Sequence, residues 1–213
     1  MAAKSTKDLT VCISKGDGTL VNVAPTAITS AAPAVVTATN SGIDGEMVYV
    51  SGTDMPAIDN KWWVSASVSG TEFTLLGSDT TDDTFDVTGA STDRYAEADM
   101  ECLCLSSLTL NVDEPGTISV ATFCDPSATI ASAVQAAGTI SFAGFVAIGD
   151  SDYQELLIAA DDGLERVMRI ALPANGYLVA PVTFSQITWD LPIDGAVGYT
   201  GTAVLSTKMV HQF

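Results

Sequence analysis

The sequence predicts a mainly β protein with a single α-helix. Short alternating or β-branched stretches recur along the chain, separated by Gly, Asp, Asn and Pro. Only one segment combines helical spacing of apolar residues with a helix start signal. Hydrophobic residues make up 47% of the chain and charged residues 16%, which favours a folded protein with a buried core over a disordered one.

The first expected strand runs from Leu9 to Ser14, where apolar and polar residues alternate, and ends at the Gly-rich turn 15–18. The alternation predicts one buried and one exposed face. A second strand is expected from Cys102 to Val112. Pro115 and Gly116 then suit the central positions of a type II turn, so the return strand 118–122 predicts a hairpin.

The stretch 125–138 consists mostly of small residues without clear periodicity, and we expect a long loop or a short helix there. Alternation resumes in 139–146, which predicts another strand. Further strands are expected at 166–172, 177–189 and 196–210, with a turn signal at Asn175-Gly176.

The expected helix begins at Ser151-Asp152, where Gln154 and Glu155 follow at the spacing of a capping box. It ends at Gly163, a residue type favoured just beyond helix C-termini. The apolar positions follow the i, i+3, i+4, i+7 pattern of a helix that lies on a sheet. They are Tyr153, Leu156, Leu157 and Ala160.

Residues 24–92 differ in amino-acid composition from the segments on either side. They are rich in Thr, Ser, Gly and Asp, and Lys61 is their only base. Four evenly spaced strands are expected within them, at 34–39, 47–50, 62–65 and 72–76. We therefore predict two domains: a discontinuous core domain, 1–23 and 93–213, and a small inserted β-domain, 24–92.

The chain is strongly acidic, with 26 Asp and Glu against 8 Lys and Arg and a formal net charge of −18. Nucleic-acid binding requires bases that displace the counterions of the phosphates, so stable DNA binding is disfavoured. No apolar run is long enough for a membrane span, and the N-terminal residues lack the apolar stretch of a secretion signal. We expect a protein made in a cytoplasm, with no membrane partner.

The four cysteines contain no CxxC pair and lack the density of a disulfide scaffold. They are therefore expected to be buried thiols. The four are Cys12, Cys102, Cys104 and Cys124.

The sequence predicts no catalytic, metal or cofactor site. His211 is the only histidine, so a Ser-His-Asp relay or a multi-histidine metal site is nearly excluded. Paired acids such as Asp82-Asp83 and Asp161-Asp162 fall where turns and helix ends would place solvated carboxylates. The acidic stretch 79–86 lacks the central Gly and terminal Glu of an EF-hand loop. No Gly-rich phosphate cradle occurs.

Two aromatic residues of the inserted segment, Trp62 and Trp63, are candidate exposed aromatics. Together with Tyr49 they would suit a sugar-binding platform, which predicts an alternative function as a carbohydrate- or surface-binding, adhesin-like β-module. Neighbouring strand residues point to opposite faces, so only one tryptophan can belong to a given patch. A carboxylate-dependent hydrolase is a third alternative, carried only by the scattered acids.

Outside the inserted segment, the chain resembles the major tail tube proteins of siphophages. The stretches that carry the resemblance are DLTVCISKGDG (8–18), CLCLSSLTL (102–110), TISVATFCD (117–125), GTISFAGF (138–145), YQEL (153–156) with DG (162–163), RIALP (169–173) and PIDGA (192–196). They cover about two thirds of the chain. The resemblance rests on the residue patterns of these stretches and on their order along the chain. It involves no invariant catalytic motif.

The inserted segment looks like a small β-module of phage structural proteins, which is similar to a domain of ubiquitin-activating enzymes. The residues concerned are PAVVT (33–37), GEMVYVSG (45–52), Asn60, Val64 and FTL (73–75). Only the fold unit is shared, and no ubiquitin chemistry follows from it.

The resemblance implies a tail-tube-type β-sandwich or barrel with one flanking α-helix and a small inserted all-β domain on the outer surface. Its copies would form hexameric rings stacked into the hollow tail tube of a virion, and DNA would pass through without binding. The implied partners are other copies and the tape measure, tail terminator and distal tail proteins. Six copies at −18 each carry a formal −108, which would repel passing DNA. Asp113 and Glu114 are the candidate lumen-facing acids.

Overall fold

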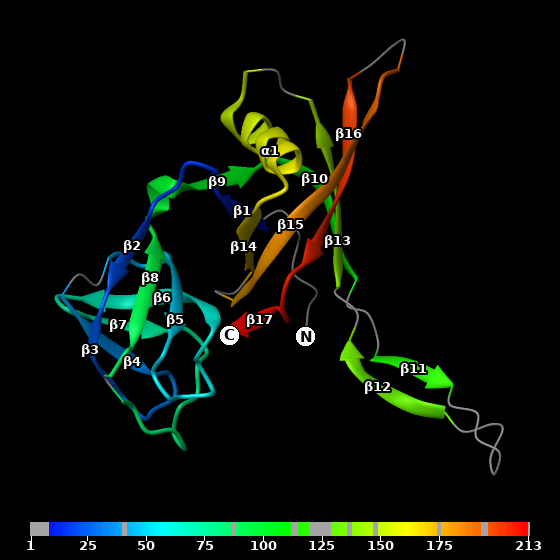
Figure 1. The fold of residues 1–213 in the computed structure, drawn as a ribbon. Helices are drawn as coiled ribbons and strands as arrows, with labels where there is room; N and C mark the ends of the chain where they lie inside the picture. Colours follow the sequence, from blue (N-terminus) through cyan, green and yellow to red (C-terminus); the bar gives the residue numbers. More distant parts are fainter. Residues whose placement is uncertain are drawn as a thin grey trace.

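The computed structural model describes residues 9–39, 42–86, 88–111, 115–119, 129–135, 138–146, 149–173, 176–192 and 196–212. It contains many strands and one α-helix, so the predicted fold class, mainly β with a flanking helix, is confirmed. The strands form two large sheets and a separate two-stranded ribbon (Figure 1).

The larger sheet, called the body, has the strand order β10-β13-β16-β15-β14-β1-β9, with β17 paired to β15. Its strands are β1 (Thr10–Ser14), β9 (Met100–Leu103), β10 (Leu105–Asn111), β13 (Thr139–Phe145), β14 (Glu165–Leu172), β15 (Gly176–Asp190), β16 (Gly198–Leu205) and β17 (Val210–Gln212).

The body curls into a nearly closed barrel with two layers of strands. Two chain segments, β9–β10 and β15, each run from one layer into the other. Strands β9 and β10 are separated only by Cys104, yet they lie at opposite ends of the strand order. Strand β15 is 15 residues long and pairs with β14 up to Thr183, and with β16 from Val182 onward. The apolar side chains of both layers meet between them in one core.

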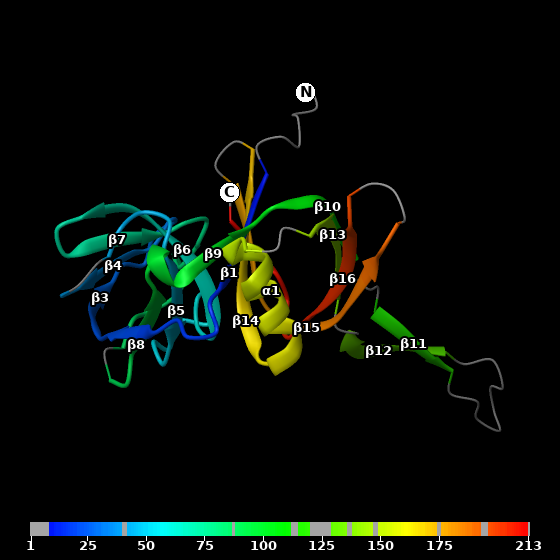
Figure 2. The ribbon, with the colours of Figure 1, turned by 90° about the horizontal axis from the view of Figure 1, so that it is seen from above.

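The helix α1 (Ser151–Asp162) lies against β9 and β15 and covers one side of this core (Figure 2). Tyr153 and Leu156 are buried, as the sequence predicted. Gly163 ends the helix with φ 62°, a left-handed conformation that favours glycine.

The predicted capping box does not form. Asp150 is the N-cap and makes no side-chain capping bond. The first helical residues bond to strands: Ser151 donates to Glu101 (2.7 Å), and Asp152 accepts from the backbone N–H of Cys104 (2.9 Å). These bonds tie the helix start to the link between β9 and β10. The Asp152 charge also raises the pKa of the Cys104 thiol, with a smaller contribution from burial.

The second sheet, called the module, has the strand order β2-β8-β5-β6-β7-β4-β3 and its own apolar core. Its strands are β2 (Leu20–Val23), β3 (Pro25–Ile28), β4 (Val35–Ala38), β5 (Met47–Ser51), β6 (Lys61–Ser69), β7 (Glu72–Leu75) and β8 (Ser91–Tyr95). A short 3-10 helix, Glu97–Asp99, leads back to the body. The sheet extends beyond the expected limits 24–92 through β2 and β8, and the division into two domains stays a prediction.

Body and module share a third apolar cluster at their junction, which includes Cys12, Met47 and Val179. Arg169 of β14 donates to the backbone oxygen of Gly45 and pairs with Glu97. The side chain of Gln212 donates to Trp62 O (3.1 Å) and accepts from Val64 N–H (2.9 Å). These bonds hold the module against the body at several points.

Strand β1 differs from the predicted half-buried strand. Cys12 and Ser14 are buried as well as Val11 and Ile13. The second face of β1 lies against the junction cluster, so polar residues on it are covered by the module. Alternation in a single strand cannot reveal that a second sheet covers the face it leaves polar.

The prediction of buried thiols is wrong for three residues, Cys12, Cys102 and Cys104. Cys12 and Cys102 are directly paired across β1 and β9 and form a disulfide. This bond joins the segments that enter and leave the module, at a sequence separation of 90. Cys104 is a free thiol but is exposed, and Cys124 lies outside the described residues.

The predicted hairpin is also wrong. Strand β10 pairs with β13, and β11 (Pro115–Ser119) begins inside the expected turn and pairs with β12 (Thr129–Gln135). The expected loop or short helix at 125–138 therefore contains a strand. The turn residues Pro115 and Gly116 favour pairing with the strand that follows directly in sequence. In the structure β10 pairs with β13 instead, and this pairing buries an apolar face.

We predict that Leu156→Ala lowers the free energy of unfolding by about 2–5 kcal/mol, because it empties a fully buried position in the body core. Ile158→Ala on the same helix is the matched control. Its side chain is 50% exposed, so the change should cost less than ~0.5 kcal/mol. Urea unfolding of the two variants measures the difference, and equal losses would contradict the placement of α1.

Candidate functional site

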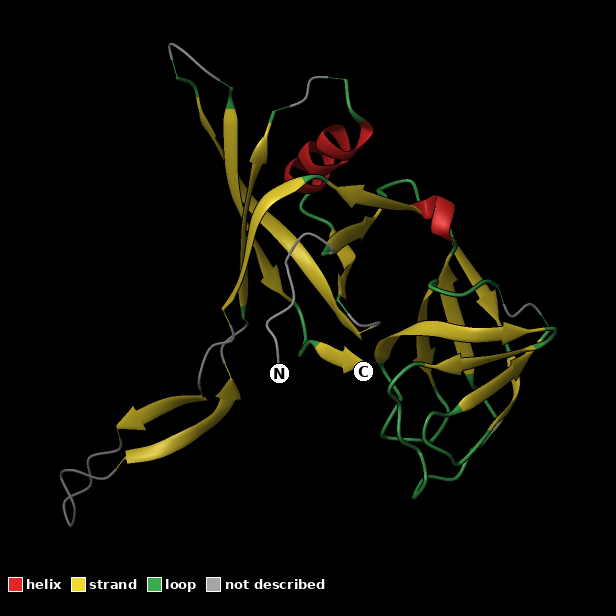
Figure 3. Cartoon of the chain, turned by 180° about the vertical axis from the view of Figure 1, so that it is seen from behind, coloured by secondary structure: helices red, strands yellow, loops and turns green. Residues whose placement is uncertain are grey.

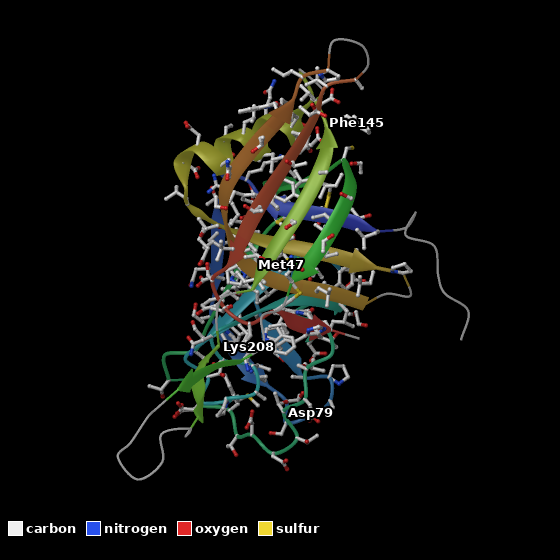
Figure 4. All side chains as sticks on the ribbon, turned by 90° about the vertical axis from the view of Figure 1, so that its right-hand side faces the viewer. Met47, Asp79, Phe145 and Lys208 are labelled. Atoms are coloured by element: carbon white, nitrogen blue, oxygen red, sulfur yellow. A yellow bond between two sulfur atoms is a disulfide. The ribbon has the colours of Figure 1, made fainter. Side chains whose placement is uncertain are left out.

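Four adjacent strands of the body, β10, β13, β16 and β15, present one bare face to solvent (Figure 4). Their inward residues, such as Ile140, Phe142 and Tyr199, fill the body core. Their outward residues are short and mostly hydroxylated, and they border a shallow depression on the sheet. We call this surface the hydroxyl face.

The strand register places the residues of the hydroxyl face in rows across the sheet. One row is Thr109, Ser141, Thr202 and Gln186, and the next is Ser107, Ala143, Thr200 and Thr188. A third row joins Asn111, Thr139, Val204 and Thr183, and a fourth ends the face with Phe145, Gly198 and Asp190.

Both lateral edges of this four-stranded sheet are open within the described residues. Strand β10 pairs only with β13. Beyond Thr183, β15 pairs only with β16, so residues 184–190 have one free side. An open edge presents backbone N–H and C=O groups that can pair with another chain. The sheet therefore has two sites for strand addition.

The two edges run in opposite directions. Each neighbouring pair from β10 to β15 is antiparallel, and the sheet has an even number of strands. When a copy is rotated about an axis along the strands, its β10 meets β15 of the first copy antiparallel. The alternation continues without a break, so this sheet can extend through successive copies.

An apolar groove follows the β15 edge, between that strand and α1. Leu157 and Ile158 line it from the helix, and Ile187 and Trp189 line it from the strand. Trp189 is 49% exposed and donates from Nε1 to the hydroxyl of Tyr153 (2.8 Å). Large exposed apolar side chains beside an open edge are typical of a surface that is buried on association.

The ribbon β11–β12 is a third feature suited to association. Its strands pair only with each other, and it projects from the body at the end where β10 stops and β13 starts (Figure 3). A lone two-stranded ribbon is marginally stable in water. We therefore expect it to gain contacts from another chain.

The predicted site residues are placed as follows. Asp113 and Glu114 lie outside the described residues. Trp63 is 4% exposed, and its Nε1 donates to Ile58 O (3.1 Å) inside the module. Trp62 is partly buried at the junction, with Tyr49 and Tyr95 at ring centroid distances of 5.2 and 5.7 Å.

Trp62 lines a groove at the junction, together with Asn60, Lys61 and Lys208. The two candidate aromatics are thus separated by the sheet, as adjacent strand residues must be.

Clusters of side chains that could bind a metal ion or catalyse a reaction are sparse in the part of the chain that the structure describes. No group of three or more His, Cys, Asp or Glu is placed there to hold a metal ion. Asp79 of the 79–86 stretch bonds locally: it accepts from the N–H and hydroxyl of Thr81, and these bonds lower its pKa. Asp83 accepts from the N–H of Ala57. Among the described residues, no helix is long and apolar enough to cross a membrane.

The hydroxyl face was missed at the sequence level, although a signal for it exists. The segments 105–111, 139–145 and 198–204 each alternate apolar or glycine positions with Ser and Thr, and none contains a charged residue. In a chain with 26 acids, three charge-free alternating strands indicate a shared surface that excludes charge. Only the strand order of the sheet shows that these three strands are neighbours.

Comparison with known proteins gives limited similarity. No family model and no curated protein matches the chain. A chain in the structure "Virion of native gene transfer agent (GTA) particle" is 16% identical, with a TM-score of 0.44, over 55% of this chain and 92% of that chain. A chain in "Tail of empty GTA particle computed with helical refinement, C6 symmetry" is 16% identical, with a TM-score of 0.43, over 55% and 89%. Neither match establishes a family.

Tyr199 supports the hydroxyl face from beneath. Its ring packs with Phe142 and Tyr153 in the core, and Gly144 on the neighbouring strand leaves room for it. Burial, followed by the negative charge of Asp152, raises the pKa of Tyr199 to about 12.

We predict that this pKa makes the protein less stable at alkaline pH. The unfolded chain ionises Tyr199 near its ordinary pKa of about 10, whereas the folded protein keeps the proton until about 12. The contribution of protonated Tyr199 to the free energy of unfolding is therefore complete below about pH 10 and is lost as the pH rises towards 12. Tyr199→Phe should flatten the fall in unfolding free energy over this window. If the unfolding free energies of Tyr199→Phe and of the native protein fall in parallel between pH 10 and 12, the raised pKa of Tyr199 is contradicted.

Proposed function

We propose that this chain is a structural virion protein whose copies assemble into stacked hexameric rings, and that these rings form the hollow tail tube through which phage DNA passes. The observation that carries the proposal is the four-stranded sheet with two open, oppositely directed edges. Pairing β10 of one copy with 184–190 of β15 in the next copy satisfies both edges and extends one antiparallel sheet around a ring.

Strand number supports a ring of several copies. A dimer would give an eight-stranded barrel, whose interior is filled by side chains, whereas barrels of about 16 strands or more enclose a channel. Six copies give 24 strands. At a strand spacing of about 4.8 Å the backbone circumference is ~115 Å, so the backbone diameter is at least ~37 Å. Such a ring leaves room for double-stranded DNA.

The distribution of mass supports an orientation of the subunit in which the hydroxyl face points to the axis. The second layer of the body, the helix and the module all lie on the side away from the hydroxyl face (Figures 1 and 4). Copies in a ring have more space at larger radius. The bulky side therefore faces outward, the hydroxyl face borders the channel, and the module decorates the outer surface.

Contacts beyond strand pairing support the same interface. The apolar groove beside β15, with Ile158 and Trp189, would be covered by the neighbour that brings its β10 to this edge. The β11–β12 ribbon, which leaves the end of the sheet, suits contacts with the adjacent ring. Tape measure, terminator and distal tail proteins are the further partners that this role implies.

The alternative, a carbohydrate- or surface-binding module, has less support. Trp63 belongs to the module core, and the Trp62 ring is already in contact with two tyrosines. A glycan array with Trp62→Ala tests this alternative, because binding that this change abolishes would favour it over the tube.

We predict that, in a background where Cys104 and Cys124 are changed to Ser, Thr109→Cys combined with Thr188→Cys forms disulfides between copies when the protein assembles. Both residues face outward on the edge strands, and within one chain they lie about 16 Å apart, too far for a disulfide. Oxidised samples should give a ladder of covalent oligomers on a non-reducing gel. Thr109→Cys with Gln186→Cys covers the neighbouring register.

Thr71→Cys, on an exposed turn of the module, combined with Thr188→Cys is the matched control and should give no ladder. Cross-linking of the single Thr109→Cys variant with itself into dimers would indicate a two-fold pairing of β10 edges. That result would contradict the ring.

A further inference from the structure

The hydroxyl face lacks charge almost completely, in contrast to the rest of this acidic chain. Of its residues in the four rows, Asp190 alone is charged, and it lies at the end of the face beside Gly198 and Phe145. The remaining side chains are hydroxyls, amides, two small apolar groups and one phenyl ring, or hydrogen in the case of Gly198.

We propose that the wall of the channel is neutral and hydroxyl-lined along the strands, so that DNA passes over Ser, Thr, Asn and Gln side chains and meets carboxylates of this face only at Asp190, at its end. This inference rests on the proposed tube. It concerns the described strands alone, and the expectation that Asp113 and Glu114 face the lumen stays a prediction.

None of the basic residues in the described part of the chain belongs to the rows of this face. Arg94, Arg166 and Arg169 form ion pairs with Glu46, Asp162 and Glu97 respectively. Lys15 pairs with Glu101, while Lys61 and Lys208 line the junction groove. Without a base on the wall, phosphates release no counterions by binding there, so DNA is not retained.

Apart from Asp190 on the face and Glu165, which pairs with Thr183 from the adjoining strand β14, many acids of the described residues lie elsewhere. The module carries Asp79, Asp82 and Asp86 in its loops, and Asp161 and Asp162 lie at the end of α1. These positions belong to the bulky side of the subunit, which the proposed ring turns outward. Their charge then favours solubility of the tube and adds little to the potential in the channel, since salt screens it within about 8–10 Å.

A neutral wall and an acidic wall predict different physical behaviour. Rings of carboxylates would concentrate cations in the channel by 10-fold or more, because a confined surface of one sign produces potentials of several kT. Hydroxyls produce no such field. They hydrogen-bond water, and their bonds to a passing phosphate exchange readily with those to water.

The test uses Thr202→Cys at the centre of the face, in a background where Cys104 and Cys124 are changed to Ser. Assembled tubes are treated with a cationic and an anionic methanethiosulfonate of similar size, and with a maleimide carrying a long polyethylene glycol chain. Ser141→Cys, in the same row, is a second site in case Thr202→Cys prevents assembly. Thr71→Cys on the module is the outer-surface control.

For a neutral wall we expect the ratio of the cationic to the anionic rate at Thr202→Cys to lie within about threefold of that for a free cysteine peptide. The bulky maleimide should label Thr71→Cys at least ~10-fold faster than Thr202→Cys, because the channel excludes large polymers.

Two results would overturn the inference while leaving the tube intact. One is a cationic preference of ~10-fold or more, the mark of an acidic wall. The other is equal labelling of both positions by the bulky maleimide, which would place the face outside. If no tube forms under any condition, the proposed function itself fails, and this inference fails with it.

Discussion

The backbone groups at the two open edges of the β10-β13-β16-β15 sheet are the constraint on which the molecule depends. A seven-residue edge at β10 and another at 184–190 of β15 leave N–H and C=O groups that must pair with water or with another chain. Soluble proteins usually block such edges with charges, prolines or bulges. Each edge has one register irregularity, at Leu105/Ser107 and at Phe184/Gln186, and the second edge ends at the charged Asp190. The stretches 107–111 and 186–189 contain no charge and no proline, so they stay open to a partner.

The rest of the fold keeps these edges accessible and rigid. Strand β15 pairs with β14 in its first half and then bends away to pair with β16, which frees the β15 edge in its second half. Helix α1 fills the space behind that edge with Leu156 and Tyr153, so the strand is supported without being covered. The disulfide Cys12–Cys102, Arg169 and Gln212 hold the module against the other layer, away from the hydroxyl face.

Local patterns in the sequence predicted most individual elements but not their partners. The helix 151–162, strands such as 139–145 and 165–172, and the four module strands follow from spacing and turn residues. The pairing of β10 with β13 does not, because the Pro115-Gly116 signal favours the nearest hairpin. The Cys12–Cys102 bond requires knowing that β1 lies beside β9, and the hydroxyl face requires the order of four strands. Long-range register, which sequence spacing does not encode, decides each of these features.

The charge of the chain is consistent with this arrangement, since many acids lie on the bulky side and the predicted contact surfaces carry few charges, such as Asp161 in the groove and Asp190 at the end of β15. The central claim is that copies of the chain complete one another's sheet around a channel. Electron microscopy of the concentrated protein tests it most directly. We predict hollow filaments of stacked rings whose innermost layer is a continuous sheet in which β10 of one copy pairs with β15 of the next. A strictly monomeric protein at high concentration, or filaments in which both edges face solvent and no channel exists, would contradict it.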